Sequence, residues 1–77
     1  MAMLHSDVVV HIDESLDDRR ISELERQISE EQGIYSACVN EGARHLLLVD
    51  YDPSGIRAGD ILERVRRNGL HAELIGM

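Results

Sequence analysis

Three side chains of the types that bind transition metals lie in apolar stretches of this sequence: His11, Cys38 and His71. Imidazole nitrogen and thiolate sulfur are ligands for zinc and copper, so these three are the candidate metal ligands and a transition metal ion is the implied cofactor. Cys38 is the only cysteine, which excludes an internal disulfide and a cysteine-only metal site within one chain. A histidine on a strand is more often a half-buried polar residue, which is the interpretation we favour, with a transition metal ion as the alternative.

A second chemical feature is an acidic turn made by Asp13, Glu14, Asp17 and Asp18. Carboxylate oxygens are the ligands that Mg²⁺ and Ca²⁺ prefer. Carboxylates also belong before a helix N-terminus, where they cap free amides and meet the positive end of the helix dipole. We favour the second interpretation, with Asp17 as the N-cap of the helix that follows.

The charge of the chain limits its partners. Fifteen acidic residues stand against eight basic ones, all arginine, and the net charge is -7. Such a chain repels phosphate backbones, so we expect no nucleic acid partner. No stretch approaches the ~20 apolar residues of a membrane span, and the first ten residues lack the pattern of a secretory signal. We expect a cytoplasmic protein that does not insert into membranes.

These side chains are positioned by a pattern of four strands and two helices. Alternation of apolar and polar residues, turn residues and helical spacing predict strands over 8–12, 34–40, 44–51 and 70–75, and helices over 18–32 and 56–67. Two connections run through helices, which favours one α+β domain over residues 1–77. The predicted fold is a ferredoxin-like βαββαβ sandwich whose antiparallel sheet has the order 4-1-3-2, with both helices on one face.

Three short segments carry a family resemblance. They run from Gly33 to Asn40, from Val49 to Pro53 and from Asn68 to Leu74, and they resemble the "GV-x-SV-x-VN", "V-x-YDP" and "GY-x-A" patterns of heavy-metal-associated, copper-chaperone-like domains. The resemblance implies this same fold. It also places Asp17 and Arg20 where that family has the two cysteines of an M-x-C-x-x-C loop. A carboxylate and a guanidinium cannot hold Cu(I), so the resemblance implies a degenerate metal loop.

The face of the sheet away from the helices has an unusual composition. Strand alternation places His11 and Cys38 there, together with the apolar residues Val9, Leu46, Leu48 and Ile75. A solvated sheet face is normally polar, so we expect a partner to cover this one. An assumed register would align Cys38, Leu46, His11 and His71 in one row.

The sequence therefore predicts a non-enzymatic binding or adaptor module that contacts a protein partner, or a second copy as a homodimer, through the open sheet face. The expected interaction surface comprises Val9, His11, Leu46, Leu48 and Ile75. The alternative is a metal-binding protein of heavy-metal transport or homeostasis that uses histidine, cysteine and carboxylate ligands. A third alternative is a small-molecule sensor, which would need a pocket at a dimer interface.

Overall fold

The computed structural model describes residues 4–76. Its elements follow the order predicted from the sequence: β1 (Ser6–Ile12), α1 (Asp18–Ser29), β2 (Ile34–Asn40), β3 (Ala43–Tyr51), α2 (Ala58–Arg66) and β4 (Ala72–Gly76). Both helices are shorter than predicted, and the expected last strand begins two residues later. The prediction of β2 agrees with the structure at both ends.

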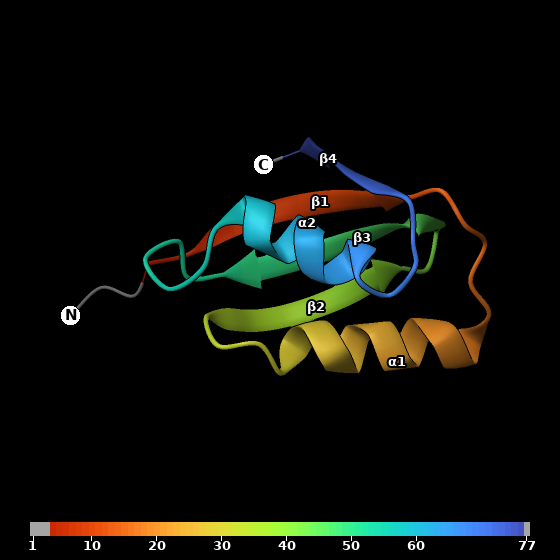
Figure 1. Cartoon of the computed structure of the whole chain (residues 1–77), viewed down its shortest axis with the longest axis horizontal. Coiled ribbons are helices and arrows are strands. Elements are labelled where there is room, and N and C mark those ends of the chain that lie inside the picture. Colours follow the sequence, from red (N-terminus) through yellow and green to blue (C-terminus); the bar gives the residue numbers. More distant parts are fainter. Residues whose placement is uncertain (1–3, 77) are drawn as a thin grey trace.

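The four strands form one antiparallel sheet in the order β2-β3-β1-β4, which is the predicted order read from the other edge. Figure 1 shows α2 in front of the central strands and α1 alongside β2. The ferredoxin-like α+β fold is confirmed.

The core lies between the sheet and the helices, and its composition follows from strand alternation. Val8, Val10, Leu47 and Val49 from the two central strands are 0% exposed. Helices add residues at helical spacing, which face the sheet as an apolar stripe. The buried helix residues are Leu24, Ile28, Ile61 and Val65.

The pairing of β2 with β3 differs from the assumed register by two residues. Cys38 lies opposite Leu48 rather than Leu46. The ladder is irregular beside the hairpin turn, where residues 44–46 fall between two consecutive pairs. A bulge of this kind displaces every later residue of the strand relative to its partner.

The pairing of β1 gives a mixed result. His11 lies opposite Leu46, as expected, but its neighbour on β4 is Glu73 and not His71, because Ile12 pairs with Ala72. His71 lies beside Asp13, whose backbone N–H donates to the His71 carbonyl at 2.8 Å. The predicted row of Cys38, Leu46, His11 and His71 is therefore wrong, and only its Leu46–His11 part is confirmed.

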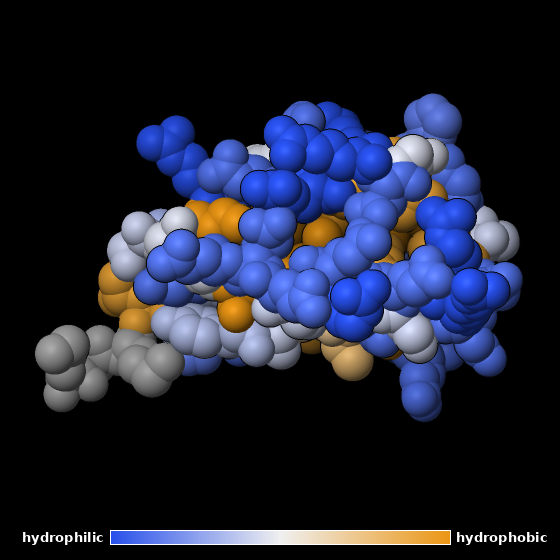
Figure 2. Space-filling model, turned by 60° about the horizontal axis from the view of Figure 1, so that its bottom comes forward, coloured by the Kyte–Doolittle hydropathy of each residue, from blue (hydrophilic) through white to orange (hydrophobic). Residues whose placement is uncertain are grey.

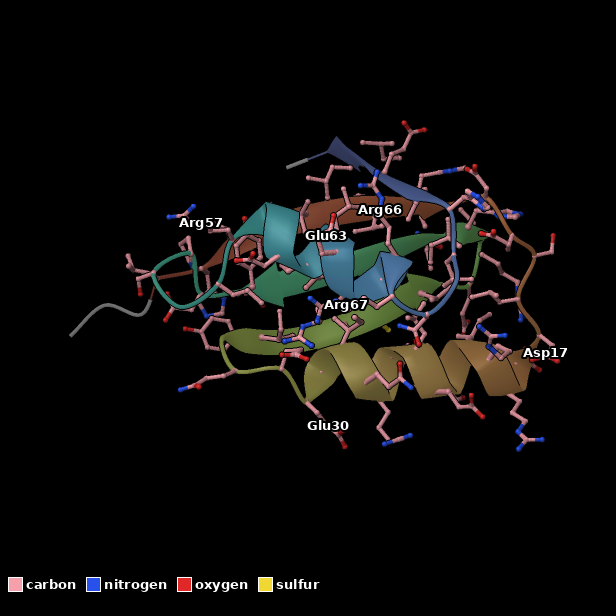
Figure 3. The ribbon with its side chains drawn as sticks, viewed as in Figure 1. Asp17, Glu30, Arg57, Glu63, Arg66 and Arg67 are labelled. Atoms are coloured by element: carbon pink, nitrogen blue, oxygen red, sulfur yellow. The ribbon has the colours of Figure 1, made fainter. Side chains whose placement is uncertain are left out.

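The predicted N-cap of α1 is present, and the helix ends at the C-cap residue Glu30. The Asp17 side chain accepts a hydrogen bond of 2.8 Å from the backbone N–H of Arg20, so the carboxylate acts as the N-cap. In Figure 3, Asp17 and Glu30 mark the two ends of this helix. Beyond it, Gly33 has a φ of 94°, a left-handed conformation that glycine adopts without strain.

Both edges of the sheet are partly occupied by side chains. On the β2 edge, the Glu25 carboxylate accepts a hydrogen bond of 2.8 Å from the Val39 backbone N–H. On the β4 edge, the Arg66 Nε donates to the Ala72 carbonyl at 3.2 Å. Free backbone groups on an edge strand invite pairing with another chain, so these contacts reduce edge-to-edge association.

The outer surface on the side of α1 is largely hydrophilic, with hydrophobic atoms visible in the gaps between polar side chains (Figure 2). Within residues 4–76, neither helix has the length and apolar character needed to cross a membrane.

Candidate functional site

The main candidate is a group of apolar side chains on the open face of the sheet, which we name the open-face band: Val9, Leu46, Leu48 and Ile75. Val9 and Leu48 are direct neighbours on β1 and β3. Leu48 is 48% exposed and Ile75 is 53% exposed, whereas Val9 and Leu46 are half-buried. Strand alternation places all four on the face that the helices leave uncovered.

His11 lies at one end of the open-face band. Its ring stacks on that of His45, with centroids 5.9 Å apart, and its Nδ1 is 3.2 Å from the Asp13 carboxylate. This Nδ1 is shielded from solvent and makes no directed hydrogen bond to the described part of the chain. The His45 Nδ1 is 2.7 Å from the Ile12 carbonyl. These contacts fix the His11 ring as a half-buried polar border of the band.

The three candidate metal ligands do not meet within one chain. Cys38 is exposed and lies opposite Leu48. His11 lies opposite Leu46, two residues away along β3, and His71 is the residue just before β4. Across residues 4–76, no three histidine, cysteine, aspartate or glutamate side chains form a group that could hold a metal ion. A site made from these three residues stays a prediction, and it requires ligands from a second chain.

His71 is held by Glu14 in what we name the loop clasp. The Glu14 Oε2 is 2.7 Å from the His71 Nδ1, and the same carboxylate accepts from the His71 backbone N–H at 2.9 and 3.1 Å. The hydrogen bond from the ring, followed by that from the backbone, lowers the pKa of Glu14 below its ordinary value of 4.5. The hydrogen bond to Glu14 and the charge of its carboxylate raise the pKa of His71 above its ordinary value of 6.5. The clasp joins the β1–α1 loop to the start of β4.

The other carboxylates of the acidic turn also make internal contacts. Asp17 caps α1, Asp18 is 2.6 Å from the Arg44 Nη2, and Asp13 approaches His11. The Asp17 contact agrees with the helix-capping interpretation favoured from the sequence, whereas Asp18 and Asp13 contact side chains. Arg44 additionally donates to the Leu16 carbonyl at 3.5 Å, which holds the loop against β3.

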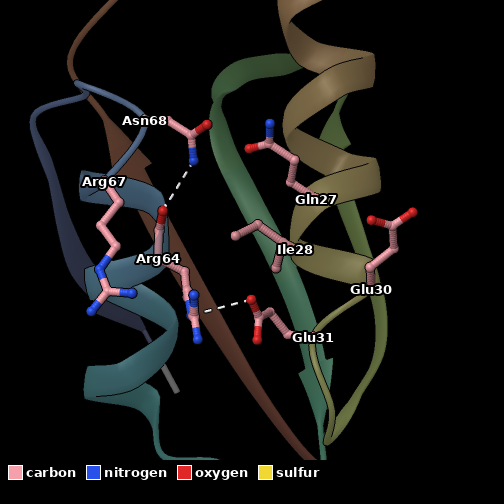
Figure 4. A pocket seen from close by; sticks show the side chains of 7 residues that line it. All are labelled: Gln27, Ile28, Glu30, Glu31, Arg64, Arg67 and Asn68. Carbon is pink, nitrogen blue, oxygen red and sulfur yellow. Dashed lines mark hydrogen bonds and ion pairs between the residues drawn. The ribbon is translucent and has the colours of Figure 1, made fainter.

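A groove of about 360 Å³ lies between the C-terminal ends of the helices (Figure 4). Arg64 crosses it to reach Glu31 at 3.2 Å, and the Asn68 amide donates to the Arg64 carbonyl at 3.0 Å. Acidic and basic side chains line it together, with Arg67 and Glu30 at its borders. This pairing neutralises the groove, so it offers no concentrated charge for a small anion or cation.

Sequence reasoning missed the contacts that fix the β1–α1 loop. Glu14 and His71 are 57 residues apart, and Asp18 and Arg44 are 26 residues apart. Neither pair has the local spacing of a helix or a turn. No signal in a single sequence joins such residues, because their contact depends on the register of β1 with β4 and on the bulge of β3.

The comparisons with known proteins bear on the fold. No family model and no curated protein matches this sequence. Among solved structures, the chain is similar to the N-terminal domain of a potential copper-translocating P-type ATPase from Bacillus subtilis in its Cu(I)-loaded state. The identity is 22%, the match covers 95% of this chain and 90% of that one, and the TM-score is 0.83.

Two further structures agree. The copper chaperone of Enterococcus hirae in its apo form is 16% identical, with 88% of this chain and 98% of that chain covered and a TM-score of 0.78. The yeast copper transporter domain CCC2A is also 16% identical, with 90% and 93% covered and a TM-score of 0.78. At these identities the likeness shows the fold alone. The chain has the fold of copper-binding heavy-metal-associated domains and chaperones, as its sequence resemblance implied.

The loop clasp predicts that the stability of the β1–α1 loop depends on pH and that the pKa of His71 depends on Glu14. Because the pKa of Glu14 is lowered, its contribution to stability is present above pH 4.5 and is lost as the pH falls through the lowered pKa. Because the pKa of His71 is raised, its contribution is full below pH 6.5 and is lost as the pH rises through the raised pKa. The clasp therefore stabilises the loop most between pH 4.5 and 6.5. In Glu14→Gln, we expect an NMR titration to show the pKa of His71 moving down toward 6.5.

The matched control is Glu30→Gln, which removes a carboxylate at the far end of α1 where Glu30 pairs with Arg26 at 3.5 Å. It should leave the His71 titration unchanged. An identical pKa for His71 in wild type and Glu14→Gln would show that the clasp does not form in solution.

Proposed function

We propose that this chain is a non-enzymatic binding module that recognises another protein through the open face of its sheet. The observation that supports it is the open-face band, where Leu48 and Ile75 are about half exposed beside Val9. Contiguous exposed apolar side chains with polar borders are typical of interaction sites. His11 forms one such border, at the end of the band nearest the β1–α1 loop. The predicted cytoplasmic location is part of this proposal.

The state of the β1–α1 loop is consistent with a role other than metal carriage. By the count from Gly33, Asp17 and Arg20 occupy the positions of the family's cysteines. Here the Asp17 carboxylate is committed to the Arg20 backbone N–H as a helix cap. Cu(I) prefers soft sulfur ligands, which this loop does not supply. A binding function for this chain therefore has to use another surface.

The proposal is tested by capture with tagged proteins from an extract of the source organism. Leu48→Asp places a charge in the centre of the open-face band. Because Leu48 is half exposed, this change should lower the free energy of unfolding of the monomer by no more than about 1 kcal/mol. We expect the wild type to capture a partner protein that Leu48→Asp does not capture, as measured by quantitative mass spectrometry of the captured material.

Gln27→Glu is the matched control, because it adds the same negative charge on exposed α1. It should capture the same protein as the wild type. Thermal unfolding of all three proteins checks that they are folded. If the wild type and Leu48→Asp capture the same proteins in the same amounts, the open face is not the binding surface.

A metal-binding or metal-transport function is the second candidate, favoured by the copper-binding neighbours of the fold. The residues of one chain do not fit such a site, because within residues 4–76 no three histidine, cysteine, aspartate or glutamate side chains form a group that could hold a metal ion. Two chains together could supply Cys38 and His11 twice, since both lie on the open side of the sheet. This candidate therefore requires a metal-dependent dimer.

Metal titration separates the two candidates. Our proposal expects metal-free protein to show no binding heat and no rise in Tm with Zn²⁺, or with Cu(I) under a reductant. The metal candidate expects a rise in Tm, because a ligand present at 100 times its Kd stabilises by about 2.7 kcal/mol. It also expects the rise to disappear in Cys38→Ser and in His11→Ala. A rise that depends on both residues would favour metal binding over our proposal.

A further inference from the structure

The arginines of this chain are segregated from the open face. All but one lie on the helices or at their ends, and Figure 3 shows Arg57, Arg66 and Arg67 on the α2 side. The exception is Arg44 of β3, which is turned toward Asp18 and the Leu16 carbonyl. The open face therefore takes its charge from acidic groups.

One end of the open-face band has two aspartates side by side. Asp7 of β1 is paired directly with Asp50 of β3, in the register adjacent to the Val9–Leu48 row. Like charges directly opposite each other on neighbouring strands destabilise a sheet. His5 approaches Asp50 at 2.9 Å. Local conflicts of this kind are retained where a surface serves a function.

The other end of the band is acidic as well. Glu73 of β4 is the cross-strand neighbour of His11, and Asp13 lies just past the end of β1 with a side chain that is 62% exposed. Among residues 4–76, neither Asp7 nor Glu73 takes part in an ion pair. The open-face band therefore has carboxylates at both of its ends along the strand direction.

This arrangement disfavours a second copy as the occupant. Because both ends of the band are acidic, a two-fold face-to-face dimer would oppose carboxylates in either orientation of the strands. The net charge of -7 adds repulsion between copies. Juxtaposed like charges suppress the wrong partner in an interface. The charge pattern instead complements a cationic partner.

We infer that the open face binds an extended, basic segment of another protein, in which arginine or lysine residues flank apolar ones; this inference rests on the proposed function. The band would bury the apolar side chains, and the carboxylates at its two ends would pair with the cations. Asp7 and the His11–Glu73 row are four residues apart along β1. At about 3.3 Å per residue the acidic groups at the two ends are roughly 13 Å apart. An extended segment that runs along the strands spans this distance in four residues and turns every second side chain toward the sheet. The bound segment would therefore have basic residues at positions i and i+4 and an apolar residue at i+2.

The experiment uses a displayed library of random peptides as the probe. Wild-type protein is the bait, and Leu48→Asp and Ile75→Asp, each confirmed as folded, are the counter-selection baits. We expect enriched peptides to have apolar residues flanked by arginine or lysine. Their NMR shift changes on the wild type should centre on Val9, Leu46 and Leu48, and their affinity should fall with rising salt.

A charge-matched pair of double variants tests the role of the carboxylates. Asp7→Asn with Glu73→Gln neutralises one acid at each end of the band. Glu30→Gln with Glu41→Gln removes the same charge from exposed positions at the end of α1 and in the β2–β3 turn. The first variant should weaken peptide binding about three- to tenfold, whereas the second should stay within about twofold of the wild type.

The outcomes separate this inference from the proposed function. Peptides that need Leu48 but contain no basic residues, or that bind both double variants equally, would overturn the inference and leave the proposed function standing. Concentration-dependent self-association in sedimentation that is lost in Leu48→Asp would identify a second copy as the occupant and also overturn it. If no peptide is enriched, or if the peptides bind Leu48→Asp as tightly as the wild type, both the inference and the proposed function fail.

Discussion

The whole structure depends on one constraint, which is that the two helices cover only one side of a four-stranded sheet. Successive side chains of a strand point to opposite sides, so neighbours in sequence meet opposite environments. On β3, Leu47 is 0% exposed and the next residue, Leu48, is 48% exposed. The inner set forms the core, and the outer set is free to differ from one protein of this fold to another. In this chain the outer set contains apolar residues in the middle of the sheet.

Function on this fold is decided by local chemistry. Solved structures with this fold include a copper chaperone and domains of copper-transporting proteins, and the three described above are 16 to 22% identical to this chain. In this chain, the β1–α1 loop is stabilised by a helix cap, by the loop clasp and by the Asp18–Arg44 pair. The carboxylates of Glu14, Asp17 and Asp18 are therefore engaged with other parts of the fold. The open face is the surface to which we assign binding, since Glu25 and Arg66 partly occupy the edges of the sheet.

Much of the fold follows from the sequence, because period-two and helical spacing are local signals. The order of the elements, the alternation of inward and outward strand residues and the N-cap at Asp17 were predicted correctly. The row of candidate ligands was not, because the bulge of β3 at residues 44–46 moves Cys38 away from Leu46. A bulge adds residues without changing the local apolar pattern, so a single sequence does not reveal it. The loop clasp was missed for a related reason, since its partners meet only once the strands are in register.

The most direct test of the central constraint compares two neighbouring residues of β3 in urea unfolding. Leu47→Ala should lower the free energy of unfolding by roughly 2–5 kcal/mol, because it leaves a cavity in the core. Leu48→Ala should lower it by less than about 1 kcal/mol at every protein concentration, because the fold does not need this side chain. Equal losses for the two variants would contradict the account, since both sides of β3 would then be buried in the free protein.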